Sequence, residues 1–169
     1  MSTYEKKELA SNEGIEFFTE LAAIIKEMCR YSPHPISTLS NVSSLLFDQI
    51  PRLNWAGFYI YDGEKLIVGP FQGKPACTEI KIGKGVCGTA AEKMETMIVE
   101  DVNKFPGHIA CDAESLSEVV APIIGEGNKL LGVIDLDSPE LNRFGSEFKQ
   151  GMSLIAKALA QGTDFSKLV

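Results

Sequence analysis

Cysteine carries the most versatile side-chain chemistry in this sequence, and three of the four cysteines lie in its middle third. They are Cys77, Cys87 and Cys111. No two of them form a Cys-x-x-Cys pair, which argues against a thioredoxin-like motif. Cys87 follows a glycine-rich turn at the start of a helical pattern, where the helix dipole favours a thiolate. Cys29 lies in a separate helical pattern, and we expect it to be inert.

A zinc site is the first alternative for these thiols. His108 and Cys111 are close in sequence and could share one ion with Cys77 and Cys87 in a tetrahedral Cys₃His arrangement. The short ligand pairs that build most zinc sites are absent among the cysteines, however. We therefore expect no metal.

Carboxylates form the second group. Side chains of a strand alternate between its two faces, so the run before Ser138 should place Leu131, Val133, Asp135 and Asp137 on one face. This face begins apolar and ends doubly acidic, and Glu118 lies on the partner strand of the predicted hairpin. Three carboxylates with no obvious basic partner suit a bound cation, either an ammonium group or a metal ion. A strand with one solvated face is the alternative.

Trp55 is the only tryptophan and opens an aromatic strand pattern. Core packing would explain it. It could also form the wall of a ligand pocket, where indole offers an apolar face and one N–H donor.

The composition is that of an ordinary globular protein: 169 residues, 44% hydrophobic, 23% charged, with a net charge of −7. An acidic chain is not expected to bind nucleic acid, which requires a basic surface. No apolar run approaches the roughly 20 residues that span a bilayer, and the first residues lack a secretory pattern. We therefore expect one cytoplasmic domain over residues 1–169, in a compartment where thiols stay reduced.

Hydrophobic periodicity divides the chain into helices and short strands. The predicted helices cover residues 13–30, 37–49, 86–94 and 146–161, with Asn12 as a candidate cap of the first and a loop over 31–36 where Pro33 and Pro35 lie. The predicted strands cover residues 55–61, 65–69, 78–82, 96–99, 117–124 and 129–136. This order predicts an α+β domain on an antiparallel sheet. The long loop 100–113 is more often functional than accidental.

Several motifs together resemble one enzyme family, the free methionine-(R)-sulfoxide reductases, which are small GAF-domain proteins. The motifs are Asn54–Tyr59, Gly69–Cys77, Gly83–Gly88, His108–Asp112 and Gly132–Ser138. The resemblance covers about residues 15 to 162. It implies a six-stranded antiparallel sheet with helices on one face, a ligand pocket on the other, and a homodimer.

The resemblance also implies a reaction. Free L-methionine (R)-sulfoxide would be reduced to L-methionine through a cysteine sulfenic acid and an intramolecular disulfide, recycled by thioredoxin or a similar dithiol and without a cofactor. By motif, Cys111 matches the catalytic thiol, while Cys77 and Cys87 match the resolving or recycling thiols, and which of them resolves stays open. Cys29 matches nothing in the motifs.

The matching pocket residues are Trp55, Glu118, Asp135 and Asp137, with Tyr59 on the same strand face as Trp55. Glu118 is the expected acid, provided that burial keeps it protonated. A non-enzymatic GAF-type sensor of a small molecule or of redox state is the alternative function. Turnover of free methionine sulfoxide would distinguish the two.

Overall fold

The protein is described here by a computed structural model that covers residues 13–32, 34–107 and 113–168. The α-helices are α1 (Ile15–Tyr31), α2 (Pro35–Gln49), α3 (Gly85–Lys93) and α4 (Ser146–Gly162). The strands are β1 (Trp55–Tyr61), β2 (Lys65–Gly73), β3 (Glu79–Lys81), β4 (Met97–Val99), β5 (Ser117–Gly125) and β6 (Lys129–Ser138). Short 3₁₀ helices cover Val102–Lys104, Glu126–Asn128 and Phe165–Lys167. Among these residues, no helix is both long and apolar enough to cross a membrane.

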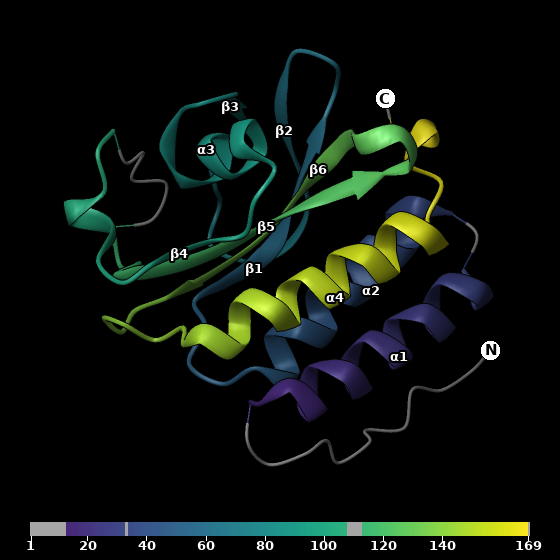
Figure 1. Cartoon of the computed structure of the whole chain (residues 1–169), viewed down its shortest axis with the longest axis horizontal. Coiled ribbons are helices and arrows are strands. Elements are labelled where there is room, and N and C mark those ends of the chain that lie inside the picture. The colour runs from purple at the N-terminus through teal and green to yellow at the C-terminus, as the bar shows by residue number, and fades with distance from the viewer. Residues whose placement is uncertain (1–12, 33, 108–112, 169) are drawn as a thin grey trace.

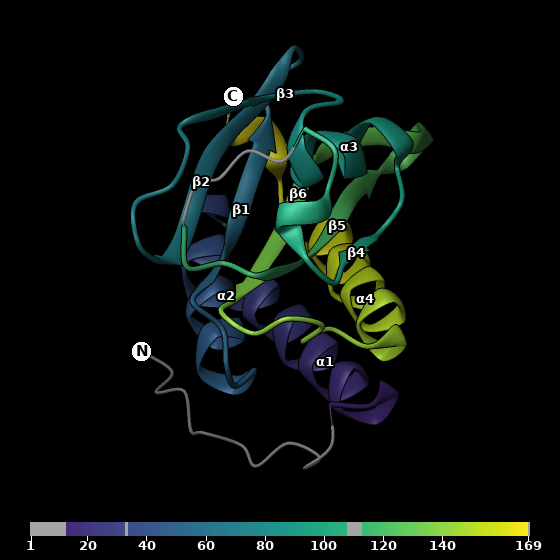
Figure 2. The same cartoon turned by 90° about the vertical axis from the view of Figure 1, so that its left-hand side faces the viewer.

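The strands form one antiparallel sheet in the order β3-β2-β1-β6-β5-β4. Helices α1, α2 and α4 cover one face of this sheet, and α3 lies on the other face (Figures 1 and 2). The predictions of an α+β fold and of a six-stranded antiparallel sheet are confirmed. The resemblance implied helices on one face only. Helix α3 departs from this expectation, because it lies on the other face, together with the predicted pocket.

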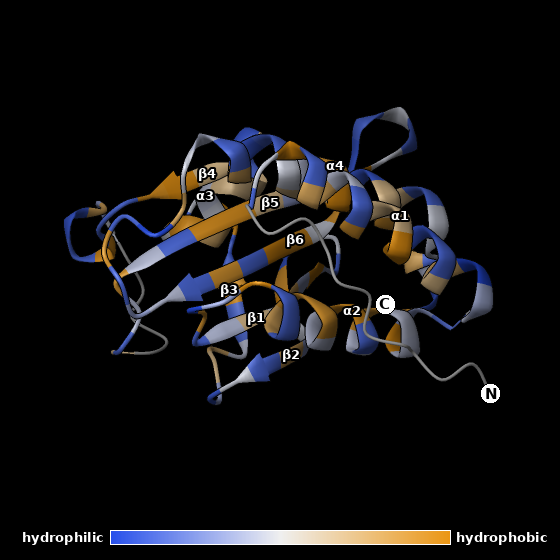
Figure 3. Ribbon diagram, turned by 90° about the horizontal axis from the view of Figure 1, so that it is seen from below, coloured by the Kyte–Doolittle hydropathy of each residue, from blue (hydrophilic) through white to orange (hydrophobic). Residues whose placement is uncertain are grey.

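Two hydrophobic cores lie on opposite faces of the sheet because its strands alternate. From β1, Ala56, Phe58 and Ile60 enter the core under α1, α2 and α4. Trp55 and Tyr59 of the same strand enter the smaller core beneath α3. In Figure 3 the ribbons of α1, α2 and α4 alternate between orange and blue, as expected of helices with one apolar side. The sheet is therefore buried on both faces, and the smaller core forms the base of the site.

Helices α1 and α4 pack closely because α4 contributes two glycines at the contact. A Cβ added at Gly151 would lie 2.1 Å from the ring of Phe18, and one added at Gly162 would lie 2.6 Å from Cβ of Cys29. Cys29 is buried there as a free thiol, 3.5 Å from Oγ1 of Thr163. Burial raises the pKa of this thiol, so Cys29 is a poor nucleophile.

We expect Cys29→Ser to leave turnover unchanged, because Cys29 lies on the helical face of the sheet, away from the residues of the pocket. The hydroxyl can keep the contact with Thr163, so only a small loss of thermal stability is expected. Steady-state kinetics and a thermal melt of the variant test this. A large fall in turnover of a fully folded variant would show that a functional thiol lies in this helix pair.

The starts of the first two helices differ by two residues each from the sequence-based predictions. The loop predicted over residues 31–36 is shorter, because α2 begins at Pro35. Proline is favoured in the first helical turn, where its missing N–H has no partner to lose. The residue that precedes α1 is Gly14, which makes no side-chain cap. The predicted cap, Asn12, lies outside the described residues.

A bulge in β6 explains one wrong face assignment. Ile123 of β5 pairs with Gly132, but Ile124 pairs with Leu130, so Leu131 has no partner of its own across the hairpin. The extra residue reverses the alternation, and Leu131 packs against the core on the helical side. Val133 remains on the face of the aspartates, as predicted.

Candidate active site

Three carboxylates meet where β5 and β6 run side by side. Glu118 of β5 pairs directly with Asp137 of β6, and Asp135 pairs with Val120 one step along the ladder. Asp135 and Asp137 belong to the last four residues of β6, and Figure 3 shows hydrophilic blue segments toward the arrowhead of this strand. All three acids line one pocket. Glu118 and Asp135 are each only 6% exposed, which excludes the alternative of a solvated strand face.

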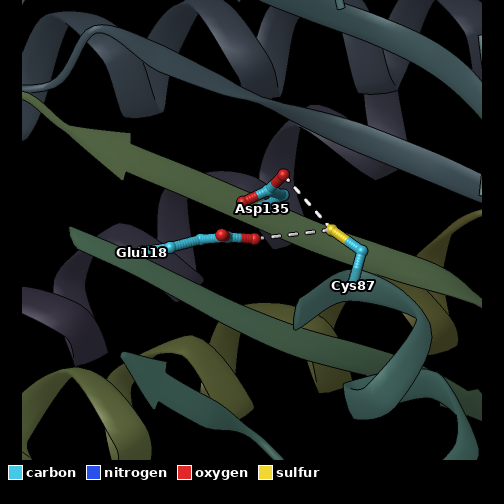
Figure 4. Close-up of side chains that lie close together, drawn as sticks. All are labelled: Cys87, Glu118 and Asp135. Carbon is cyan, nitrogen blue, oxygen red and sulfur yellow. Dashed lines mark hydrogen bonds between the residues drawn. The ribbon is translucent and has the colours of Figure 1, made fainter. Parts of the chain in front are cut away.

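Cys87 closes this pocket from the α3 side. It is the third residue of α3 and lies over the acids (Figure 4). Its Sγ donates to Oδ2 of Asp135 over 3.2 Å and to Oε1 of Glu118 over 3.8 Å. One ligand atom from each of these residues lies within 4.8 Å of the others, close enough to surround a single cation. Oδ1 of Asp135 has no hydrogen-bond partner among the described residues.

Burial sets the protonation of these groups. It raises the pKa of Asp135 to about 7, although hydrogen bonds from Cys87 and with Glu118 work in the opposite direction. Burial also raises the pKa of Glu118 well above its usual range, and the charges of Asp135 and Asp137 raise it further. At neutral pH the Glu118–Asp135 pair therefore retains a proton, and we place it on Glu118.

The thiolate predicted for Cys87 is wrong, although its position in the first turn of a helix is right. Burial raises the pKa of this thiol well above its ordinary value, and the charges of Asp135 and Glu118 raise it further. Desolvation together with two adjacent carboxylates outweighs the helix dipole, which contributes about 1 kcal/mol. Cys87 is thus a protonated hydrogen-bond donor here.

Aromatic rings form one wall of the pocket. Trp55 is 3% exposed and stacks on Tyr59, with ring centroids 5.9 Å apart, and on Phe71, at 5.1 Å. Gly57 permits this stack, since a Cβ there would lie 2.3 Å from Cβ of Phe71. The indole N–H donates to the carbonyl oxygen of Lys74 over 3.2 Å. Trp55 therefore lines the pocket as part of an aromatic stack, and its N–H is already engaged.

Comparison with known proteins identifies the family. The GAF domain model matches residues 34–162. A protein of Escherichia coli (strain K12) named free methionine-R-sulfoxide reductase is 43% identical over 156 residues, which is 90% of this chain and 93% of that protein. A Saccharomyces cerevisiae protein of the same name is 49% identical over 137 residues, 77% of this chain and 76% of that protein. The chain belongs to the free methionine-R-sulfoxide reductase family of GAF-domain proteins.

A solved structure supports the same family at the level of the fold. It is the X-ray structure of free methionine-R-sulfoxide reductase from Neisseria meningitidis in complex with its substrate. That chain is 31% identical, and the superposition has a TM-score of 0.87 and covers 96% of this chain and 98% of that one. The resemblance to free methionine-(R)-sulfoxide reductases seen in the sequence motifs is therefore confirmed.

The cysteines that match the reductase family motifs differ in state. Cys77 is disulfide-bonded, whereas Cys87 is a free thiol. The hydroxyl of Tyr59 donates to the carbonyl oxygen of Cys77 over 3.2 Å, which ties this segment to the aromatic wall. Cys111, the expected catalytic residue, lies outside the described residues, as does His108 of the zinc alternative. Their roles remain predictions.

Sequence reasoning missed several residues that line the pocket of this reductase family member. Ser115 and Lys84 line it together with the acids, and Phe71 stacks on Trp55. Phe71 lies inside a matched family motif, so it could have been selected. Ser115 has no such signal, because the residue that positions it, Asn54, is 61 residues away in the chain.

Proposed function

We propose that the chain reduces free L-methionine (R)-sulfoxide to L-methionine, with its own thiols as the source of electrons. The observation that carries the proposal is the buried acidic pocket beneath an aromatic wall, in a chain of this reductase family. This pocket suits a small ligand with an ammonium group at one end and an apolar S-methyl group at the other.

The aspartates account for selectivity toward the free amino acid. Asp135 lies buried with one oxygen unpartnered among the described residues, and Asp137 lines the same pocket. The substrate ammonium fills this position with charge-assisted hydrogen bonds. A methionine sulfoxide within a peptide has no such ammonium, so its binding would leave Asp135 buried and unpaired. Trp55 covers the methyl group and excludes water.

The chemistry uses one thiolate and one acid. The thiolate of Cys111 attacks the sulfoxide sulfur and forms an S–S bond, and Glu118 protonates the sulfoxide oxygen. The hydroxyl then moves to the Cys111 sulfur as the S–O bond and the new S–S bond both break, so that methionine leaves and Cys111 becomes a sulfenic acid. Glu118 can act as the acid because burial raises its pKa. It regains its proton from solvent before the next cycle.

Cys77 is the thiol that we assign to resolution. It condenses with the Cys111 sulfenic acid, which forms a disulfide and releases water. The disulfide-bonded state of Cys77 and the free, buried state of Cys87 support this choice between the two thiols. Thioredoxin or a similar dithiol then reduces the disulfide. This recycling needs a reducing compartment such as the cytoplasm, and a homodimer is the assembly we expect.

The test is steady-state turnover with thioredoxin, thioredoxin reductase and NADPH. Free methionine (R)-sulfoxide should support NADPH oxidation, whereas the (S)-epimer and N-acetylated methionine sulfoxide should not. If turnover fails with thioredoxin, the assay is repeated with dithiothreitol. Methionine formation with dithiothreitol alone would mean that the reductant, and not the substrate, was assigned wrongly. Absence of methionine formation with both reductants would contradict the proposal and favour a sensor.

The pH profile of kcat/KM should have an acidic limb near pH 7. Asp135 must be ionised to bind the ammonium, and its pKa is about 7, so kcat/KM rises as pH increases through this value. The groups that face Asp135 are Cys87 from α3, Glu118 from β5, Tyr59 from β1 and Asp137 on its own strand. Kinetics between pH 5 and 9 test this. Asp135→Asn should lose the limb, and a limb retained in that variant would assign it to another group.

A further inference from the structure

The acidic pocket has few donors left for an anionic ligand group. Its buried side-chain donors are mostly engaged: Trp55 Nε1 with the carbonyl of Lys74, Tyr59 with the carbonyl of Cys77, and Cys87 with two carboxylates. A free amino acid nevertheless carries a carboxylate. Near the carboxylates of Asp135 and Asp137 this group would be repelled unless a donor receives it.

Ser115 is the buried exception among the described side chains that line the pocket. It is 7% exposed, and its Oγ accepts a hydrogen bond from Nδ2 of Asn54 over 2.9 Å. Since that contact uses an oxygen lone pair, the hydroxyl proton has no acceptor among the residues that the structure describes. A buried hydroxyl proton of this kind normally has a partner. Asn54 itself is held at the end of β1 by its backbone N–H, which donates to Asp137.

The surroundings of this hydroxyl favour an anion. Helix α3 begins at Gly85 without a side-chain cap, and Gly85, Val86 and Cys87 line the same pocket as Ser115. The first N–H groups of a helix attract negative charge. Lys84 lies at the rim of the pocket and is exposed to solvent. The pocket therefore offers a zwitterionic ligand both its carboxylates and the Ser115 hydroxyl beside the first N–H groups of α3.

We propose that the Ser115 hydroxyl, positioned by Asn54, donates to the α-carboxylate of the substrate. This inference rests on the proposed function and extends it to the second end of the amino acid. The ammonium binds Asp135 and Asp137, and the carboxylate binds Ser115 beside the start of α3. Recognition of both ends excludes a methionine sulfoxide residue at either terminus of a peptide, because each terminus retains only one of the two charges.

The experiment compares two ligands that differ only in the carboxylate. They are L-methionine (R)-sulfoxide and 3-(methylsulfinyl)propylamine, which keeps the sulfoxide and the ammonium. Dissociation constants are measured by the fluorescence of Trp55, the sole tryptophan, in a Cys111→Ser background that prevents turnover. Ser115→Ala, Ser115→Thr and Lys84→Ala are introduced into this background, with a thermal melt for each.

Ser115→Ala should weaken binding of the amino acid by about 10-fold to 100-fold, the usual range for a lost hydrogen bond to a charged group. Binding of the amine should not change, and Ser115→Thr should restore much of the affinity for the amino acid. Equal weakening of both ligands would assign the hydroxyl to the sulfoxide oxygen and overturn the inference.

Other outcomes are equally decisive. A selective loss in Lys84→Ala with no loss in Ser115→Ala would place the carboxylate on the lysine and overturn the inference. If the parent background binds neither ligand, the inference and the proposed function both fail. If the unmodified protein turns over free methionine sulfoxide but Ser115→Ala does not discriminate between the ligands, only the inference fails.

Discussion

Cys111→Ser should lower kcat for free methionine (R)-sulfoxide by a factor on the order of 1,000 or more. A serine hydroxyl is far less nucleophilic than a thiolate toward sulfur and cannot form the sulfenic acid or the disulfide. Binding should persist, because the residues that contact the substrate in our proposal, Trp55, Glu118 and Asp135, remain in place. Steady-state kinetics and a titration of Trp55 fluorescence measure the two effects separately.

Cys77→Ser is the matched control for this variant. It removes the thiol that we assign to resolution but keeps Cys111, so its first turnover should proceed while turnover with thioredoxin stops. Cys87→Ser is a second control for Cys111→Ser, because the introduced serine hydroxyl can still donate a hydrogen bond to Asp135. Near-normal turnover of Cys111→Ser with thioredoxin would overturn the assignment of the catalytic thiol.

Asp135→Asn should raise KM for free methionine (R)-sulfoxide by about 10-fold to 150-fold. The variant loses a charge-assisted hydrogen bond to the ammonium, worth roughly 1.5–3 kcal/mol, at about 1.4 kcal/mol for each factor of ten. Asp137→Asn is the companion variant, and it separates the contribution of the less buried aspartate. Unchanged KM in both variants would mean that the ammonium binds elsewhere.

Asp135→Asn should also stabilise the fold at alkaline pH. The pKa of Asp135 is raised from 3.8 to about 7 in the folded protein, so the protonated form is favoured by folding. This contribution is complete below about pH 4 and is lost as pH rises through 7. Asparagine is never ionised, so the variant should melt higher than the wild type at pH 8, by on the order of 5 °C, and near the wild type at pH 4. A lower melting temperature at pH 8 would contradict the assigned cost of burying Asp135.

The acidic face could be predicted because side chains alternate between the two faces of a strand, and this alternation depends only on local backbone geometry. Asp135 and Asp137 follow it, and the hairpin then brings Glu118 opposite Asp137. Leu131 could not be assigned in this way, since the bulge arises from the pairing of β6 with β5. Similarly, Pro35 was expected in a loop, but a proline at the start of a helix and one in a loop have the same local pattern.

Protonation and polar contacts between distant segments could not be predicted. The position of Cys87 in α3 follows from local glycines and helical spacing. Its pKa depends on Glu118 and Asp135, which lie 31 and 48 residues further along the chain. The contact between Asn54 and Ser115 has no periodic signature and depends on how β1 meets the segment before β5.

A single-turnover measurement tests the central claim most directly. The fully reduced protein is mixed with excess free methionine (R)-sulfoxide in the absence of any other reductant, and methionine, free thiols and disulfide-linked peptides are then quantified. We expect about one methionine and the loss of about two thiols for each chain, with a disulfide that joins Cys77 to Cys111. No methionine, or methionine formed without loss of thiols, would contradict the proposal that the protein reduces the sulfoxide with its own cysteines.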